Sequence, residues 1–255
     1  MEYSILVEDH KRAEDIKAEH GLSIYFSAGG KKILFDTGQS GLFLENAKKM
    51  GVDLSDIDYA VISHGHYDHT GGLRHLPEGC KAVLVAHPDY GFQKYDGERS
   101  IGMPATCSLE EELSRIPLEL SENVYFLGEI PGERNPFGQY IAADGVKRDD
   151  SLYDDTGIAV LEGKKAVVLC GCAHSGIVNI ARYTKNLYEP DEIVLVGGFH
   201  LHDKAEKEIM GVIGELKELN ISATYCGHCT GKKAAELLIK EFGGEEMYSG
   251  MRIEL

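Results

Sequence analysis

The chain has 255 residues, of which 43% are hydrophobic, so it is long enough to bury a large core. This length and composition predict one sizeable α/β domain spanning residues 1–255. The formal net charge of −16 would repel nucleic acid and anionic membranes, which argues against both as partners. A small phosphorylated substrate is not excluded, because bound cations would reverse the sign of the field locally.

The sequence also bears on location and redox chemistry. No apolar run is long enough to cross a bilayer, and the first residues, Met1 to Ile5, lack the basic region and apolar core of a signal peptide. We therefore expect a cytoplasmic protein. Its six cysteines are not expected to form a disulfide framework in that compartment. Composition gives no oligomeric state.

The first part of the chain predicts strands followed by a helix. Residues 3–9 alternate weakly and predict an edge strand. Residues 22–27 and 32–35 predict a hairpin around a Gly-Gly turn, where positive φ is needed. Residues 41–50 carry apolar side chains at helical spacing, and Gly51 is expected to end that helix.

The stretch from Ser63 to Gly72 carries the strongest indication of chemistry. It follows Tyr59 to Ile62, a short apolar run that predicts a buried strand. Four potential metal ligands lie within six residues: His64, His66, Asp68 and His69. Because side chains alternate along extended backbone, His64 and His66 would point to the same side. A cluster of unpaired imidazoles would be costly to bury, so we favour a metal site, with zinc, iron or manganese as candidates.

The middle of the chain is harder to interpret. A strand predicted at 81–86 is followed by residues 90–122, where aromatic side chains are interspersed with glycine and charge. This stretch is either an insertion that covers a substrate or a long surface loop. Residues 124–127 predict a strand, and residues 131–150, rich in proline, glycine and charge, predict another loop.

The second half alternates strands with helices. A hairpin predicted over 157–169 leads into Cys-Gly-Cys-Ala-His and a helix, and strands predicted at 193–196 and 223–225 each precede another helix. A histidine follows each of these strands: His174, His200 and His228. Ligands collect beyond the carboxyl ends of strands in open α/β sheets, so these histidines are candidate site residues.

These motifs resemble the metallo-β-lactamase superfamily over nearly the whole chain. The pattern His-x-His-x-Asp-His is present without departure at residues 64–69, directly after a predicted buried strand. The resemblance implies an αββα sandwich, in which two mixed sheets pack face to face with helices outside and a metal site at one edge. It also implies two divalent metal ions, zinc first, with iron or manganese as alternatives.

The later motifs narrow this resemblance. Residues 171–180, 197–201 and 226–231 are similar to the branch related to the archaeal 7,8-dihydropterin-6-yl-methyl-4-(β-D-ribofuranosyl)aminobenzene-5'-phosphate synthase. Many members of that branch are known only as metal-dependent hydrolases. Members of the glyoxalase-II type place a metal-bridging aspartate after a strand that ends in glycine, whereas Cys172 follows Gly171 here.

The resemblance implies a ligand set and two candidate catalytic residues. One metal is expected on His64, His66 and His174, and the other on Asp68, His69 and His228. Asp68 is also the candidate to orient or deprotonate a water. His200 is expected to bind substrate or to donate a proton to a leaving group, and its alternative role is that of a surface or supporting histidine beside His202.

Other assignments stay open at this point. Asp154 or Asp155 could supply a carboxylate ligand in place of His174, and Cys172 could be a soft metal ligand. The remaining cysteines are either a redox pair, for Cys226 and Cys229, or small buried apolar groups, which we favour for Cys80, Cys107 and Cys170.

The function expected from this pattern is that of a metal-dependent hydrolase or transferase with a metal-activated water or a Lewis-acid centre. A pterin- or phosphosugar-type small molecule is the candidate substrate. Two alternatives use the same fold: an iron-loaded oxidoreductase, and a non-catalytic metal-binding protein.

Overall fold

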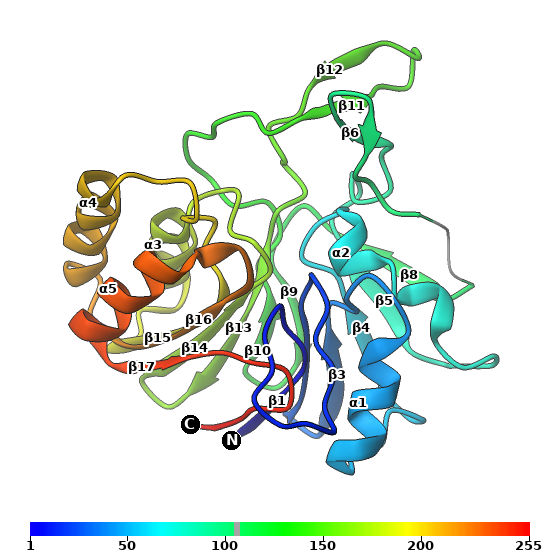
Figure 1. The fold of residues 1–255 in the computed structure, drawn as a ribbon, viewed down its shortest axis with the longest axis horizontal. Helices are drawn as coiled ribbons and strands as arrows, with labels where there is room; N and C mark the ends of the chain where they lie inside the picture. The colour runs from blue at the N-terminus through cyan, green and yellow to red at the C-terminus, as the bar shows by residue number, and fades with distance from the viewer. Residues whose placement is uncertain (105–107) are drawn as a thin grey trace.

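The computed structural model describes residues 1–104 and 108–255, so Cys107 lies outside the described residues. Two seven-stranded mixed sheets pack face to face, and helices cover their outer faces (Figure 1). This is the αββα sandwich that the sequence resemblance implied. The two chain termini lie next to each other at one side of the sandwich (Figure 1).

The first sheet combines the N-terminal strands with the last strand of the chain. Its members are β1 (Glu2–Val7), β2 (Ser23–Ala28), β3 (Lys31–Phe35), β4 (Tyr59–Val61), β5 (Val83–Ala86), β8 (Glu110–Leu113) and β18 (Arg252–Glu254). They are arranged in the order β18-β1-β2-β3-β4-β5-β8, and β3, β4, β5 and β8 run parallel. The expectation of an edge strand at residues 3–9 is wrong, because β18 pairs with β1 on the side away from β2.

The second sheet is built mainly from the second half of the chain. Its members are β9 (Leu118–Ser121), β10 (Val124–Phe126), β13 (Gly157–Glu162), β14 (Lys165–Cys170), β15 (Glu192–Gly198), β16 (Ile221–Gly227) and β17 (Gly244–Glu246). They are arranged in the order β17-β16-β15-β14-β13-β10-β9. Because β14, β15 and β16 are parallel, their carboxyl ends lie at the same edge of the sheet.

Strand β14 illustrates why strands of the second sheet carry apolar side chains on both of their faces. Val167 and Leu169 belong to the core between the two sheets, whereas Val168 and Cys170 belong to the core under the outer helices. All four side chains are completely buried. A strand covered on both sides therefore lacks the polar alternation of a surface strand.

The helices form the outer layers. The first sheet is covered by α1 (Leu42–Met50), and the second by α3 (Ile177–Tyr188), α4 (Glu206–Lys217) and α5 (Lys232–Phe242) (Figure 1). The expected end of α1 is confirmed, since Gly51 has a φ of 71° and caps the helix in the left-handed region. Shorter helices, α2 (Tyr67–Thr70), η1 (Leu73–His75) and η2 (His228–Thr230), lie at the edge where the strands end.

A small four-stranded sheet projects from the sandwich (Figure 1). It consists of β6 (Lys94–Asp96), β7 (Arg99–Ser100), β11 (Gln139–Ile141) and β12 (Lys147–Asp149), in the order β12-β11-β6-β7. The stretch 90–122 is therefore divided, because β8 and β9 join the large sheets while β6 and β7 leave them. The prediction of a loop over 131–150 is wrong at β11 and β12.

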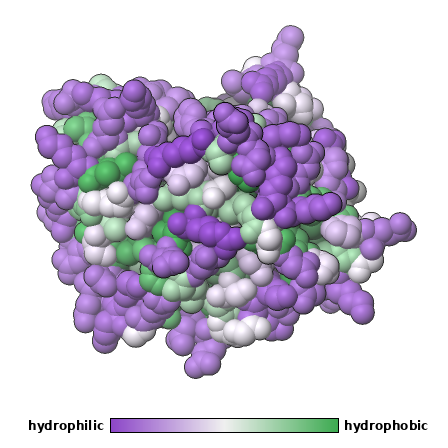
Figure 2. Space-filling model, turned by 60° about the horizontal axis from the view of Figure 1, so that its bottom comes forward, coloured by the Kyte–Doolittle hydropathy of each residue, from purple (hydrophilic) through white to green (hydrophobic). Residues whose placement is uncertain are grey.

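The molecular surface is largely hydrophilic in the view of Figure 2. Hydrophilic residues border most of the face shown in Figure 2, and apolar residues are exposed in smaller areas nearer its centre. None of the described helices is long and apolar enough to cross a membrane.

Candidate metal centre

The histidine-rich segments meet at the edge where β4, β14 and β16 end. His64 and His66 follow β4, and His174 follows β14. The ring centres of His64 and His66 are 4.6 Å apart, and that of His174 lies 4.9 Å from the first and 5.0 Å from the second. The structure thus brings together the three histidines that the sequence analysis assigned to one metal.

The second predicted group lies directly beside the first. Asp68 Oδ2 is 3.6 Å from His69 Nε2 and 3.4 Å from His228 Nε2. The rings of His69 and His228 are centred 5.1 Å apart. Because the rings of His64 and His69 are centred only 4.3 Å apart, all six predicted ligands form one continuous cluster.

The donor atoms of this cluster fit metal ions. His64 Nε2 and His66 Nδ1 are 3.0 Å apart, and two nitrogens on one tetrahedral zinc would lie about 3.3 Å apart. The Nε2 atoms of His66 and His174 are buried and have no hydrogen-bond partner among the described residues. Leaving such nitrogens unpaired is costly, so a cation would satisfy atoms that the protein does not.

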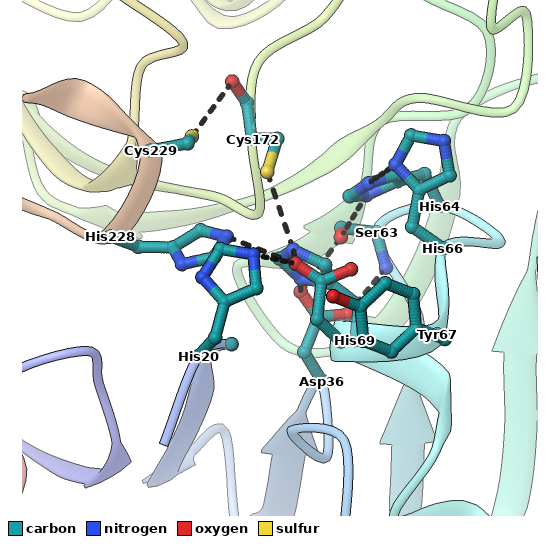
Figure 3. A network of polar contacts seen from close by, with 12 residues as sticks. His20, Asp36, Ser63, His64, His66, Tyr67, His69, Cys172, His228 and Cys229 are labelled. Atoms are coloured by element: carbon teal, nitrogen blue, oxygen red, sulfur yellow. Dashed lines mark hydrogen bonds and ion pairs between the residues drawn. The ribbon is translucent and has the colours of Figure 1, made fainter. Parts of the chain in front are cut away.

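Asp36 orients His69 directly and His64 through Ser63 (Figure 3). Its Oδ2 lies 2.7 Å from His69 Nδ1 and accepts the hydroxyl of Ser63 at 2.7 Å. The Ser63 oxygen in turn lies 2.9 Å from His64 Nδ1. Because both Nδ1 atoms are engaged, His69 and His64 direct their Nε2 atoms into the cluster. Supporting carboxylates fix ligating histidines in this way in metal sites.

Asp9 and His20 support the other side of the cluster and were missed by the sequence analysis. Asp9 Oδ1 is 2.7 Å from His228 Nδ1, and Asp9 Oδ2 is 2.9 Å from His20 Nδ1. His20 Nε2 then reaches Asp68 Oδ2 at 3.3 Å. Both residues precede β2, and a single histidine outside any motif offers no pattern by which to find it.

Burial sets the charge of three of the histidines, whereas the Asp68 and Asp9 carboxylates raise the pKa of His228 well above its usual value against the effect of burial. Burial lowers the pKa of His66 to about 4 and the pKa values of His64 and His174 well below their usual range. These imidazoles are therefore neutral near pH 7, which is the form that binds metal. Burial would raise the pKa of Asp68, but the neighbouring imidazoles, His69 first, outweigh it and keep the pKa of that carboxyl below its usual range.

The two alternative carboxylates, Asp154 and Asp155, have hydrogen-bond partners of their own, although Asp155 Oδ1 has none among the described residues. Asp154 Oδ1 lies 2.8 Å from Lys94 Nζ, and Asp155 Oδ2 accepts the backbone N–H and the hydroxyl of Ser175 at 2.8 and 2.5 Å. Both side chains support the loops of the cluster from outside it. The His174 ring, in contrast, lies directly against the rings of His64 and His66.

The cysteines divide into a core group and a site group. Cys170 and Cys226 are completely buried in the hydrophobic core, and Cys80 is partly buried. Cys226 and Cys229, for which a redox pair was one of the open alternatives, are both free thiols in this structure. Cys172 Sγ lies 3.3 Å from His69 Nε2, and the Cys229 thiol donates to the Cys172 carbonyl at 3.6 Å (Figure 3).

A cavity of about 210 Å³ opens onto the cluster. Tyr67, Arg99 and Phe137 form part of its wall, together with His200. The ring of His200 is centred 4.3 Å from that of His174, and its backbone has a φ of 48°. His200 therefore lies on the cavity wall, directly beside His174.

Comparisons with known proteins agree with this architecture. A family model described as the metallo-beta-lactamase superfamily matches residues 17–188. The 7,8-dihydropterin-6-methyl-4-(beta-D-ribofuranosyl)-aminobenzene-5'-phosphate synthase of Methanocaldococcus jannaschii is 31% identical over 251 residues, which cover 88% of this chain and 85% of that protein. An uncharacterised protein of the same archaeon is 29% identical over 239 residues, covering 90% of this chain and 91% of the relative.

A solved structure is similar over the full length. It is described as a metal-dependent hydrolase of the beta-lactamase superfamily and has a TM-score of 0.88 and 31% identity. The match covers 100% of this chain and 99% of the other. Fold, motif and similarity agree, and the chain belongs to the metallo-β-lactamase superfamily.

Proposed function

We propose that this chain is an enzyme that uses two divalent cations to cleave or transfer a group on a small phosphorylated molecule. The observation that carries the proposal is the convergence of five histidines and Asp68 on one buried cluster beside a cavity. The superfamily is metal-dependent, and the full-length structural relative is described as a metal-dependent hydrolase.

The two cations would be held by the two groups of side chains. His64, His66 and His174 would bind one, and Asp68, His69 and His228 the other. A set so rich in imidazole suits zinc, with iron and manganese as the competing metals. When bound, the cations would lower the pKa of a water and polarise a carbonyl or phosphoryl oxygen of the substrate.

Asp68 is the residue that we assign to proton transfer. Its Oδ2 lies 3.3 Å from Nε2 of His20, whose side chain is 52% exposed. Asp68 accepts a proton from the attacking water, and His20 passes it to solvent because it contacts both the carboxylate and bulk water. His200, beside His174 on the cavity wall, donates a proton to the leaving group.

Arg99 is the proposed anchor for the phosphate of the substrate. Its Nη2 donates to the Tyr67 hydroxyl at 2.9 Å, and its guanidinium carbon lies 5.4 Å from the centre of that ring. Among residues 1–104 and 108–255 no carboxylate forms an ion pair with Arg99. Five other arginines do have carboxylate partners: Arg12, Arg115, Arg148, Arg182 and Arg252. A guanidinium at a cavity wall without its own carboxylate suits a bidentate contact with phosphate. The phosphate in the name of the archaeal relative is consistent with this choice.

The small sheet brings Arg99 to the metal cluster. The Tyr67 N–H donates to the Ile101 carbonyl at 2.9 Å, and His66 pairs with Gly102 in an isolated bridge. The segment that follows β7 is therefore attached to the predicted metal-binding segment itself. This attachment supports a substrate-covering role for the first part of residues 90–122.

The test of the proposed function begins with metal-free protein. Chelator-treated protein should turn over none of a panel of pterin- and sugar-phosphate esters, and added zinc should restore turnover. Reactions in ¹⁸O-water separate the two reaction types, since hydrolysis places the label in the product and transfer to an organic acceptor does not. Full turnover by His66→Ala would contradict the proposal, and metal analysis of protein purified without added metal would distinguish zinc from iron.

The substrate anchor is tested separately. Losing a charge-assisted hydrogen bond costs about 1.5–3 kcal/mol, so Arg99→Ala should raise KM for a phosphorylated substrate about 10- to 150-fold with little change in kcat. Arg148→Ala is the matched control, because Arg148 lies on the same small sheet but pairs with Asp144. An unchanged KM in Arg99→Ala would exclude Arg99 as the anchor.

A further inference from the structure

The thiol of Cys172 is shared by both histidine groups. The potential ligand atoms of His64, Cys172 and His174 all lie within 4.8 Å of one another. The same limit holds for His69, Cys172 and His228. Figure 3 shows the sulfur directed toward His69, between His228 on one side and His64 on the other. The sulfur also forms a third such group with His200 and Cys229, so one atom takes part in three compact groups, two of which contain predicted metal ligands.

The backbone around Cys172 has little freedom to place this sulfur elsewhere. A Cβ on Gly171 would lie 2.0 Å from Ser63 Oγ, so the end of β14 is in direct contact with the pair that orients His64 and His69. Ala173 follows with a φ of 54°, which turns the chain sharply. The Cys172 side chain is 4% exposed, so the sulfur is fixed inside the cluster.

The distances around the sulfur match those of a metal ligand. With Zn–S near 2.3 Å and Zn–N near 2.05 Å, a sulfur and a nitrogen on one tetrahedral zinc lie about 3.6 Å apart. Cys172 Sγ lies 3.3 Å from His69 Nε2. In the first group, His174 Nε2 is buried without a hydrogen-bond partner among the described residues, and in the second, His228 Nε2 lies 3.4 Å from Asp68 Oδ2.

We propose that the Cys172 thiolate bridges the two cations of the site. This inference rests on the proposed pair of metal ions. The thiol proton is released to solvent when the metals bind, and the sulfur then donates one electron pair to each cation. A soft thiolate bridge favours zinc or iron over manganese. A bridging carboxylate would not select against manganese, because carboxylate oxygens also bind that metal well.

Cobalt(II) is the probe, because a thiolate bound to cobalt gives a charge-transfer absorption in the near ultraviolet that imidazole and carboxylate do not give. Wild-type protein loaded with two equivalents of cobalt should show this band, and Cys172→Ser should lose it. Cys80→Ser is the matched control and should keep the band, because Cys80 packs against the core beside α1, away from the cluster. Cys229, which forms a compact group with Cys172 and His200, is tested separately: Cys229→Ser should keep the band, and its loss there would assign the thiolate to Cys229 instead. Cys172→Asp should bind two cobalt ions without the band.

Metal affinity gives a second measurement. Loss of a supporting residue weakens metal binding by about 10- to 100-fold, so loss of a ligand shared by both ions should weaken both by at least about tenfold. Two bound cobalt ions without the band in wild-type protein, or a band that persists in Cys172→Ser, would overturn the thiolate bridge and leave the proposed enzyme intact. If wild-type protein bound no cobalt, the bridge and the proposed function would both fail.

Discussion

Replacing Lys94 by methionine should destabilise the fold severely, because Lys94 is a buried cation between two buried carboxylates. Its side chain is 1% exposed, and Nζ lies 2.6 Å from Asp150 Oδ2 and 2.8 Å from Asp154 Oδ1. Asp154 also accepts the N–H of Gly65, between the first two predicted metal ligands. The substitution therefore removes the positive charge that holds this loop in place.

The magnitude follows from the contacts. At 2.8 Å and an effective dielectric constant of about 20, each charge pair is worth about 6 kcal/mol, most of which offsets the cost of removing the charges from water. Removing one partner leaves uncompensated buried charge, and we expect Lys94→Met to lower the free energy of unfolding by about 3–5 kcal/mol at pH 7. Denaturant titration at 25 °C measures this loss.

The loss should depend on pH in a defined direction. Burial raises the pKa of Asp150 even beside Lys94, whereas Lys94 helps to hold the pKa of the buried Asp154 below its usual value. Without Lys94 the folded-state pKa values of both carboxyls should rise, because burial then acts without the neighbouring cation. Groups with raised folded pKa values bind protons more readily in the folded state, so the deficit should shrink as pH falls and grow as pH rises through those pKa values. Lys233→Met, which breaks the exposed pair with Glu206, should leave stability nearly unchanged. A Lys94→Met loss below about 1 kcal/mol, within the range of exposed pairs, would refute this reasoning.

Further predictions concern glycines and the support of the ligands. A Cβ on Gly65 would lie 1.9 Å from the Tyr90 carbonyl oxygen. Gly65→Ala should therefore lower the free energy of unfolding by at least about 1–3 kcal/mol in denaturant titration. An unchanged free energy of unfolding would show that the loop moves to accommodate the methyl group without strain. Gly211 lies inside α4, and a Cβ added there would have no neighbouring atom within 4 Å, so Gly211→Ala should instead stabilise by about 0.5–1 kcal/mol; a loss would contradict that open geometry. Asp36→Asn, which weakens the contact with His69 Nδ1, should lower zinc affinity about 10- to 100-fold in competition with a chelator, and unchanged affinity would show that His69 needs no such support.

The sequence was most informative where chemistry is dense and local. His64, His66, Asp68 and His69 could be grouped from their spacing, and His174 was found because it follows a predicted strand. Parallel strands bring their carboxyl ends to one edge, so a strand pattern alone predicts which segments meet. The resemblance added the two-sheet architecture, which the structure confirms.

The sequence was least informative where single residues act across long separations. Asp9 and His20 belong to no motif, and their contacts with His228 and Asp68 depend on how the start and end of the chain meet. A buried Lys94 is equally hidden, because lysine is expected at the surface until two carboxylates are placed around it. The small sheet was missed for a similar reason, since its strands come from two separate polar stretches.

Anomalous diffraction from crystals grown with zinc tests the central claim most directly. The account predicts two zinc peaks, one among His64, His66 and His174 and the other among Asp68, His69 and His228. Crystals with ample zinc but no anomalous peak between these side chains would contradict it.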